Sequence, residues 1–110
     1  MPTTTPPDQV NKPDIFLINK ALDVLSGKWR LYIILSLDNQ TLRYSQFNER
    51  LPGVSQKVLA GELKALVALG VMERRIYAEV PPRVEYTLTQ RGQQALPMLK
   101  QIQQIGQIFT

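Results

Sequence analysis

Apolar residues recur at steps of three and four near both ends of the chain, a spacing typical of amphipathic helices. Segment 14–25 is apolar on two faces, and Asp14 is placed to cap its first turn. Segment 89–109, which Thr89 can cap, is apolar on one side and rich in glutamine on the rest. We therefore predict a helix at each end of the chain, and the first has more apolar surface than one neighbouring element covers.

Segment 28–37 is apolar nearly all round. A helix with that pattern is buried on most sides, so we predict that it lies at the centre of the core. Because Trp29 and Tyr32 belong to it, we expect both rings to be core side chains rather than stacking platforms for a ligand.

The middle of the chain alternates turn residues with short periodic runs. We predict a very short strand at 41–43, a short helix at 46–51 capped by Ser45, a turn at Pro52-Gly53, and a longer helix at 56–69 capped by Ser55 and ended by Gly70. Two runs rich in β-branched and aromatic residues, 71–77 and 83–88, predict a hairpin whose link contains two prolines.

A short helix and a longer one across a brief turn form a helix-turn-helix, and a hairpin that follows them supplies a wing. The predicted fold class is mainly α with a small β-hairpin (α+β): a winged helix-turn-helix with extra N- and C-terminal helices for dimerisation. We expect a flexible tail at 1–13 and a single domain at 14–110. Its parts are the N-terminal helices (14–38), the helix-turn-helix and wing (41–88), and the C-terminal dimerisation helix (89–109).

Composition excludes several kinds of chemistry. The 110 residues include no cysteine and no histidine, which removes disulfides, thiol chemistry and zinc sites built on these residues. The commonest catalytic bases and nucleophiles are also missing, so we expect no enzyme and no cofactor or metal site. No apolar run reaches the length of a membrane span and no signal peptide is recognisable, so we expect a cytoplasmic protein.

The net charge of +4 is unevenly placed. Between Lys28 and Arg91 there are ten basic and six acidic residues, so the two flanks together are neutral. A basic middle between neutral ends is expected of a central nucleic-acid surface. A solvated surface with a slight basic excess would give the same charge pattern and explains it equally well.

The helix predicted at 56–69 has small and basic residues on the face opposite its leucines. They follow the spacing i, i+3, i+4, i+7: Lys57, Ala60, Gly61 and Lys64, with Gln56 beside them. Small residues permit close approach to the major groove, lysine reaches phosphate or guanine, and glutamine can bond adenine. Ser55 and the first amides of the helix are placed to meet a phosphate. The alternative is a solvated helix face that holds two lysines.

Further candidates for DNA contact flank this helix. Three precede or begin the short helix, where such proteins cross the DNA backbone: Arg43, Tyr44 and Ser45. Arg83, at the hairpin tip, could enter a minor groove or bind phosphate, and alternatively could pair with Glu79 or Glu85. Because Arg74 and Arg75 alternate faces on a strand, at most one of them can face DNA.

Six motifs stand in order along the chain: ALDVLSGKW from Ala21, RYSQF from Arg43, LPGVSQKVL from Leu51, LKAL from Leu63, GVMER from Gly70 and YAEVPPRVEYTLT from Tyr77. Through them, segment 21–89 resembles the HxlR-type regulators, a family of winged-helix proteins. The combination of SGKW with VPPRVEYTLT is specific for this family.

The resemblance implies a homodimer on double-stranded DNA, in which two recognition helices read a palindromic operator. It places the start of the recognition helix at Ser55, Gln56 and Lys57, and the wing at 81–83. Many family members carry a Cys-Pro pair near the N-terminus for thiol sensing, whereas Lys12 precedes Pro13 here, so thiol sensing is not inherited. In addition, Gly61 replaces a long polar residue.

The terminal helices are expected to form the dimer interface and to pair about a twofold axis. The residues predicted for it are Ile15, Ile18, Leu22, Leu96, Leu99, Ile102, Ile105 and Phe109. Such pairing would set two recognition helices roughly 34 Å apart, one turn of DNA. Two alternatives remain: a last helix that only covers its own domain, and a winged-helix module that binds protein instead of DNA. Any effector would be an unidentified small molecule held between the helices.

Overall fold

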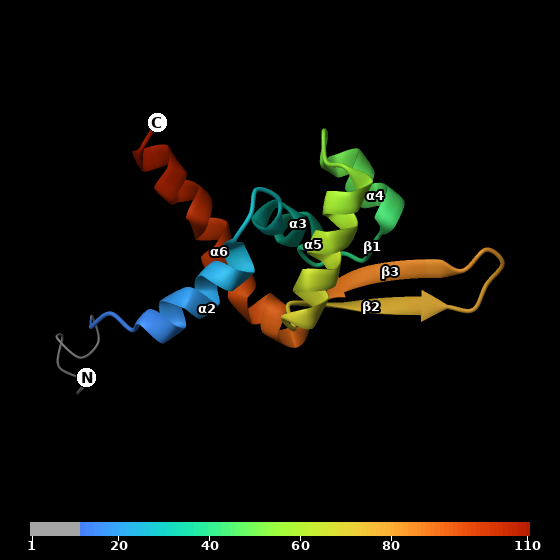
Figure 1. Cartoon of the computed structure of the whole chain (residues 1–110), viewed down its shortest axis with the longest axis horizontal. Helices are drawn as coiled ribbons and strands as arrows, with labels where there is room; N and C mark the ends of the chain where they lie inside the picture. The colour runs from blue at the N-terminus through green and yellow to red at the C-terminus, as the bar shows by residue number, and fades with distance from the viewer. Residues whose placement is uncertain (1–11) are drawn as a thin grey trace.

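A computed structural model describes residues 12–110 of the chain, so the tail expected at 1–13 lies almost wholly outside the described residues. The helices are α2 (Ile15–Leu25), α3 (Arg30–Leu37), α4 (Tyr44–Arg50), α5 (Gln56–Ala68) and α6 (Gln90–Ile108), and the strands are β1 (Leu42–Arg43), β2 (Met72–Tyr77) and β3 (Arg83–Leu88). Mostly helical with a small antiparallel sheet, the chain has the element order of a winged helix-turn-helix, as predicted (Figure 1).

The sheet has the order β1-β3-β2, with β3 in the centre. Along the hairpin, Met72 lies opposite Leu88 and Tyr77 lies opposite Arg83. The short strand β1 joins through Leu42, which lies opposite Tyr86. Only the end of the hairpin near Met72 packs on the helices, so the other end projects from the domain as a wing (Figure 1).

The core lies between α3, α4, α5 and the inner face of the sheet. Its fully buried side chains are Ile33, Ile34, Leu37, Leu42, Phe47, Leu51, Leu59, Leu63, Leu66 and Met72. The Phe47 ring meets the Tyr86 ring edge-on, with 5.9 Å between centroids, which joins α4 to the central strand. Both helices of the helix-turn-helix are therefore held on a packed scaffold.

Helix α5 ends at a glycine turn that directs the chain into β2. Gly70 has a φ of +80°, which suits glycine. Its amide donates to Val67 O at 3.0 Å, and the amide of Val71 donates to Leu66 O at 3.1 Å. This is the Schellman arrangement, and it confirms the predicted helix end.

The start of α6 is fastened to the same turn. As predicted, Thr89 caps the helix, because its hydroxyl accepts from the Gly92 amide at 3.1 Å. The Thr89 hydroxyl also donates to Gly70 O at 2.6 Å, and the Thr89 amide donates to Val71 O at 3.1 Å. A Cβ on Gly92 would overlap the Val71 carbonyl oxygen, so only glycine fits this close approach.

Two predicted helix starts differ from the structure. The core helix begins at Arg30 instead of Lys28, because the chain turns at Gly27, where φ is +84°. The short helix begins at Tyr44, so Ser45 lies inside it and is not its cap. The side chain of Gln46 accepts from the amide of Arg43 at 2.8 Å and so closes the first turn directly after β1.

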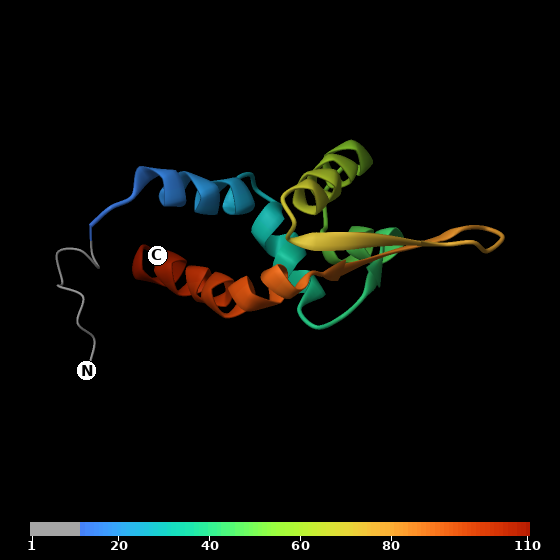
Figure 2. The same cartoon turned by 90° about the horizontal axis from the view of Figure 1, so that it is seen from below.

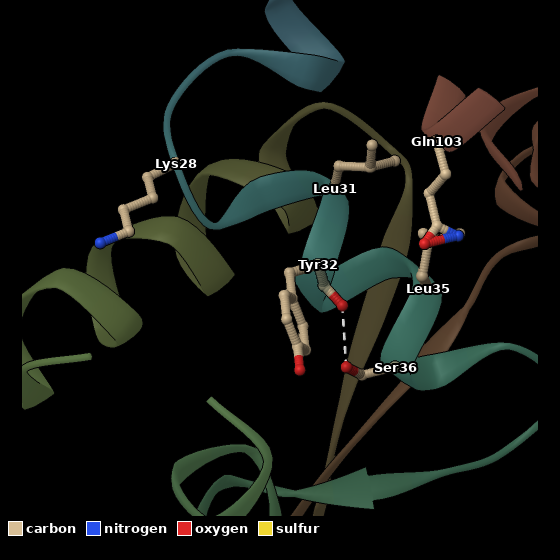
Figure 3. A pocket seen from close by; sticks show the side chains of 6 residues that line it. All are labelled: Lys28, Leu31, Tyr32, Leu35, Ser36 and Gln103. Atoms are coloured by element: carbon tan, nitrogen blue, oxygen red, sulfur yellow. Dashed lines mark hydrogen bonds between the residues drawn. The ribbon is translucent and has the colours of Figure 1, made fainter. Parts of the chain in front are cut away.

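The expectation that Trp29, just before α3, and Tyr32, within it, are both core side chains was half right. Trp29 packs partly buried against the core, whereas the Tyr32 side chain is 51% exposed. Figure 3 shows its ring beside a surface hollow of about 480 Å³ that α3 shares with Gln103 of α6. Tyr32 lies on the outer side of α3 because Ile33 and Ile34 take the inner side.

The two terminal helices leave the domain on the side opposite the wing (Figures 1 and 2). Helix α2 has no buried residue, and only Val24 and Leu25 near its end pack partly against the core. In α6, Leu96 and Leu99 are 5% and 7% exposed and belong to the core of the single chain. They therefore leave the set of residues that a partner could cover.

The rest of the predicted interface stays accessible. Exposed side chains in this set are Ile15, Ile18, Leu22, Ile105 and Phe109, while Ile102 is half-buried. None of the helices within residues 12–110 combines the length and the apolar character needed to cross a membrane.

Candidate nucleic-acid interface

Helix α5 presents the surface that its sequence predicts. Ser55 caps it, since its Oγ accepts from the Val58 amide at 3.1 Å. Leu59, Leu63 and Leu66 are fully buried on the inner face. On the outer face every predicted residue is exposed: Gln56, Lys57, Ala60, Gly61 and Lys64. A Cβ on Gly61 would meet no atom within 4 Å, so the protein's own packing does not require a glycine there.

Tyr44 contributes to this surface by holding α5. Its hydroxyl donates to the carbonyl oxygen of Gln56 at 3.0 Å, and its ring is half-buried. The predicted contact residue Tyr44 thus fixes the first turn of α5 relative to α4. Ser45, next to it, is exposed on the first turn of α4.

A groove of about 360 Å³ separates the outer face of α5 from the wing. Ala60, Leu63, Lys64 and Val67 line it from α5, and Tyr44, Arg74 and Tyr86 complete it. The groove therefore has an apolar floor and two cationic side chains at its rim, one from the helix and one from β2.

The structure decides between the two neighbouring arginines of β2. Arg74 lies opposite Tyr86 in the ladder and lines the groove beside Lys64. Arg75 points to the other face, where its guanidinium forms an ion pair with Glu73 at 2.6 Å. The hydrogen bond to Glu73 raises the pKa of Arg75 further above its usual value. Arg74 is thus the member of the pair on the side of α5.

Arg83, at the wing tip, is not a free cation but is paired with neighbouring side chains. It forms ion pairs with Glu79 at 3.2 Å and with Glu85 at 3.4 Å, and its guanidinium stacks 4.2 Å from the centroid of the Tyr77 ring. Both carboxylates named in the alternative for Arg83 are therefore its partners. Arg83 and Arg43 line the same surface hollow, of about 350 Å³, and Arg43 is exposed at the end of β1.

These pairs distribute the charge of the basic middle segment. Glu62, Glu73, Glu79 and Glu85 are all engaged with arginines. Within residues 12–110, the basic side chains of α5 and the three strands that have no ion-pair partner are Arg43, Lys57, Lys64 and Arg74. On neighbouring segments Lys28, Arg50 and Arg91 are unpaired as well. The outer face of α5 and the groove beside it therefore carry uncompensated positive charge, which is suited to phosphates.

Sequence reasoning left one candidate unresolved and missed another. The alternation along β2 pointed to Arg74 or Arg75 but could not choose between them, because the choice depends on which face of the hairpin packs against α5. Val80, fully exposed at the tip of the wing, was not singled out. The run Val80-Pro81-Pro82 was the available signal, since an extended tip leaves an apolar side chain without cover.

Comparison with known proteins also indicates a helix-turn-helix protein. Residues 24–110 match the family of HxlR-like helix-turn-helix proteins. An HTH-type transcriptional regulator from Methanothermobacter thermautotrophicus is 35% identical over 92 residues, which cover 84% of this chain and 70% of that protein. The regulator YvaP from Bacillus subtilis is 40% identical over 83 residues, 76% of this chain and 77% of its own.

Among solved structures, a MarR-family transcriptional regulator from Porphyromonas gingivalis W83 is 34% identical, with a TM-score of 0.76 over 96% of this chain and 97% of that one. These relatives are regulators, not enzymes, and the solved structure shares the winged-helix fold. From the match over residues 24–110, together with the exposed face of α5, we conclude that this chain belongs to the HxlR-like family of helix-turn-helix transcriptional regulators.

Proposed function

We propose that two copies of the chain bind a palindromic operator, each with α5 in the major groove. The observation that carries this proposal is the outer face of α5, where small residues lie beside two lysines without ion-pair partners in the described part of the chain. Because Ala60 and Gly61 add little bulk, the helix backbone can come close to base edges. Lys57 and Gln56 in the first turn would then read bases, and Lys64 with Arg74 would bind backbone phosphates.

The proposed contact residues divide by role. Ser55, Ser45 and Tyr44 lie where the helix-turn-helix would cross the DNA backbone, and Tyr44 also holds the first turn of α5 in place. Arg43 supplies a cation beside the wing. Arg83 would reach phosphate only by exchanging its carboxylate partners, so we assign it a smaller part than Lys57.

The second copy is proposed because of the terminal helices. An isolated 11-residue helix without a buried side chain is marginal in water, since most helix stability in proteins comes from packing. Helix α2 and the end of α6 lie on the side away from the wing (Figures 1 and 2), and both carry exposed apolar side chains. An isologous interface of these helices would bury them and leave both α5 faces free for DNA.

Such a regulator would act in the cytoplasm. A small-molecule effector remains a prediction without an identified ligand. Cysteine-based sensing is not proposed, because the chain has no cysteine.

The test is binding of the full chain to DNA selected from a random-sequence library, followed by fluorescence anisotropy on the selected duplex. Leaving Lys57 to the bases, the unpaired Arg43, Lys64 and Arg74 in each copy give about six phosphate contacts per dimer, so log affinity should fall with log salt at a slope of roughly −5. A slope near zero would refute DNA binding and favour the protein-binding alternative. Mutation K57A should weaken binding and relax the selected sequence, whereas K100A, which removes the same charge from α6, should change neither.

A further inference from the structure

An ion pair connects the core to the proposed recognition helix. The guanidinium of Arg30, the first residue of α3, meets the carboxylate of Glu62 on α5. Its Nε lies 3.1 Å from one oxygen and its Nη2 lies 3.4 Å from the other, a two-point contact. The side chains are 18% and 20% exposed, so this pair is better shielded from solvent than the other ion pairs of residues 12–110.

The same guanidinium also holds α2. Its remaining nitrogen, Nη1, donates to the carbonyl oxygen of Asp23, in the last turn of that helix. A last-turn carbonyl has no partner within its own helix, so Arg30 supplies both a donor and a favourable charge there. One side chain thereby links the end of α2 to the middle of α5.

Apart from Val24 and Leu25 near its end, which pack partly against the core, few contacts set the direction of α2. It has no buried residue, and the connection to α3 turns at Gly27 with a φ of +84°. A Cβ at Gly27 would lie 3.1 Å from Glu62 Oε2, so the connection also passes close to this carboxylate. The contacts around Glu62 therefore contribute to the direction of α2 relative to α5.

We propose that Arg30 is a positioning residue that sets the separation of the two recognition helices and hence the half-site spacing of the operator. The inference rests on the proposed dimer, in which α2 forms the interface and α5 enters the groove. A change in the direction of α2 alters the angle between the two copies, which moves one α5 relative to the other. One base pair of spacing corresponds to about 3.4 Å along the duplex and a tenth of a turn around it.

The experiment uses the operator selected with the full chain and two derivatives whose central spacer is one base pair shorter or longer. Wild-type protein should bind both derivatives at least about tenfold more weakly than the selected duplex, since half-site spacing is a geometric requirement of a rigid dimer. For R30M this ratio should fall to about threefold or less, because α2 is no longer fastened to α5. A mere loss of stability would lower the affinity for all three duplexes alike and leave the ratio unchanged.

Two further variants separate the two links that Arg30 makes. R30K keeps the charge but loses the fork, so its ratio should lie between those of wild type and R30M. The double variant R30E/E62R restores an ion pair between α3 and α5, but a carboxylate at position 30 cannot donate to the Asp23 carbonyl, so its ratio should stay low. If R30M does not fold, these two variants carry the same comparison.

The outcomes distinguish this inference from the function on which it rests. A wild-type protein that binds no DNA overturns the proposed function. A wild-type protein that binds all three spacings equally leaves DNA binding intact and overturns the role of Arg30. A full wild-type ratio in R30M or in R30E/E62R also overturns it, because the link to α2 would then be unnecessary.

Discussion

Replacing Arg74 or Arg75 with alanine tests the side of the wing that meets DNA. The two residues are neighbours on β2, and each substitution removes one positive charge. Arg74 lines the groove beside Lys64, whereas Arg75 is paired with Glu73 at 2.6 Å on the opposite face. Since the change in net charge is the same, a difference between the variants reports where each side chain lies and whether its charge is already paired.

The expected loss of DNA affinity follows from the number of phosphate contacts removed. A dimer that loses Arg74 loses two phosphate contacts, so the salt slope should become less steep by about 2. At about 1 kcal/mol for each exposed contact, affinity should fall by roughly thirtyfold. For the R75A variant we expect a change within about twofold and an unaltered slope, because distant exposed charges are screened at ordinary salt.

The assay is fluorescence anisotropy of the selected duplex at four or five salt concentrations, with circular dichroism melts of both variants as the control for folding. Equal losses in R74A and R75A would mean that only net charge matters, and the groove would not be a contact site. A loss confined to R75A would place the DNA on the opposite face of the hairpin and refute the assignment of Arg74.

Three other predictions follow from the packing. Mutation G92A should lower the free energy of unfolding by about 2 kcal/mol or more, because the added methyl group overlaps the carbonyl oxygen of Val71. The control G106A, in the same helix, should raise it by up to about 1 kcal/mol. If thermal melts at one protein concentration shift the two variants in the same direction, this packing is wrong. Mutation G61A should also stabilise the free protein by up to about 1 kcal/mol but weaken operator binding, and unchanged affinity in anisotropy would show that the helix backbone does not approach the groove closely. Light scattering should give near twice the 12.5 kDa chain mass for the wild type and near one chain mass for I105D. The matched control Q107D, on the opposite side of α6, should stay near twice the chain mass. A wild-type monomer at micromolar concentration would refute the dimer.

Local signals in the sequence were sufficient for most of the elements. The caps Asp14, Ser55 and Thr89 act as predicted, since an N-cap hydrogen bond involves residues only three positions apart. Gly70 ends α5 because the left-handed turn it adopts is a property of that residue itself. The outer face of α5 was likewise readable, because leucines at helical spacing leave only the opposite side for solvent. Ser45 is not the cap, because the helix begins two residues earlier than predicted, where the Gln46 side chain accepts from the Arg43 amide.

Residues far apart in the chain decided the rest. The burial of Leu96 and Leu99 depends on where α6 crosses the core, which an apolar stripe alone does not state. Alternation along β2 could not choose between Arg74 and Arg75, because the choice requires knowing which face of the hairpin packs beside α5. Arg30 and Glu62 are 32 positions apart, and no local pattern pairs them. Sequence by itself thus determined the elements, their ends and the chemistry of the α5 face, whereas only the tertiary structure decided which charges are paired and which apolar residues remain exposed, because both depend on contacts between elements.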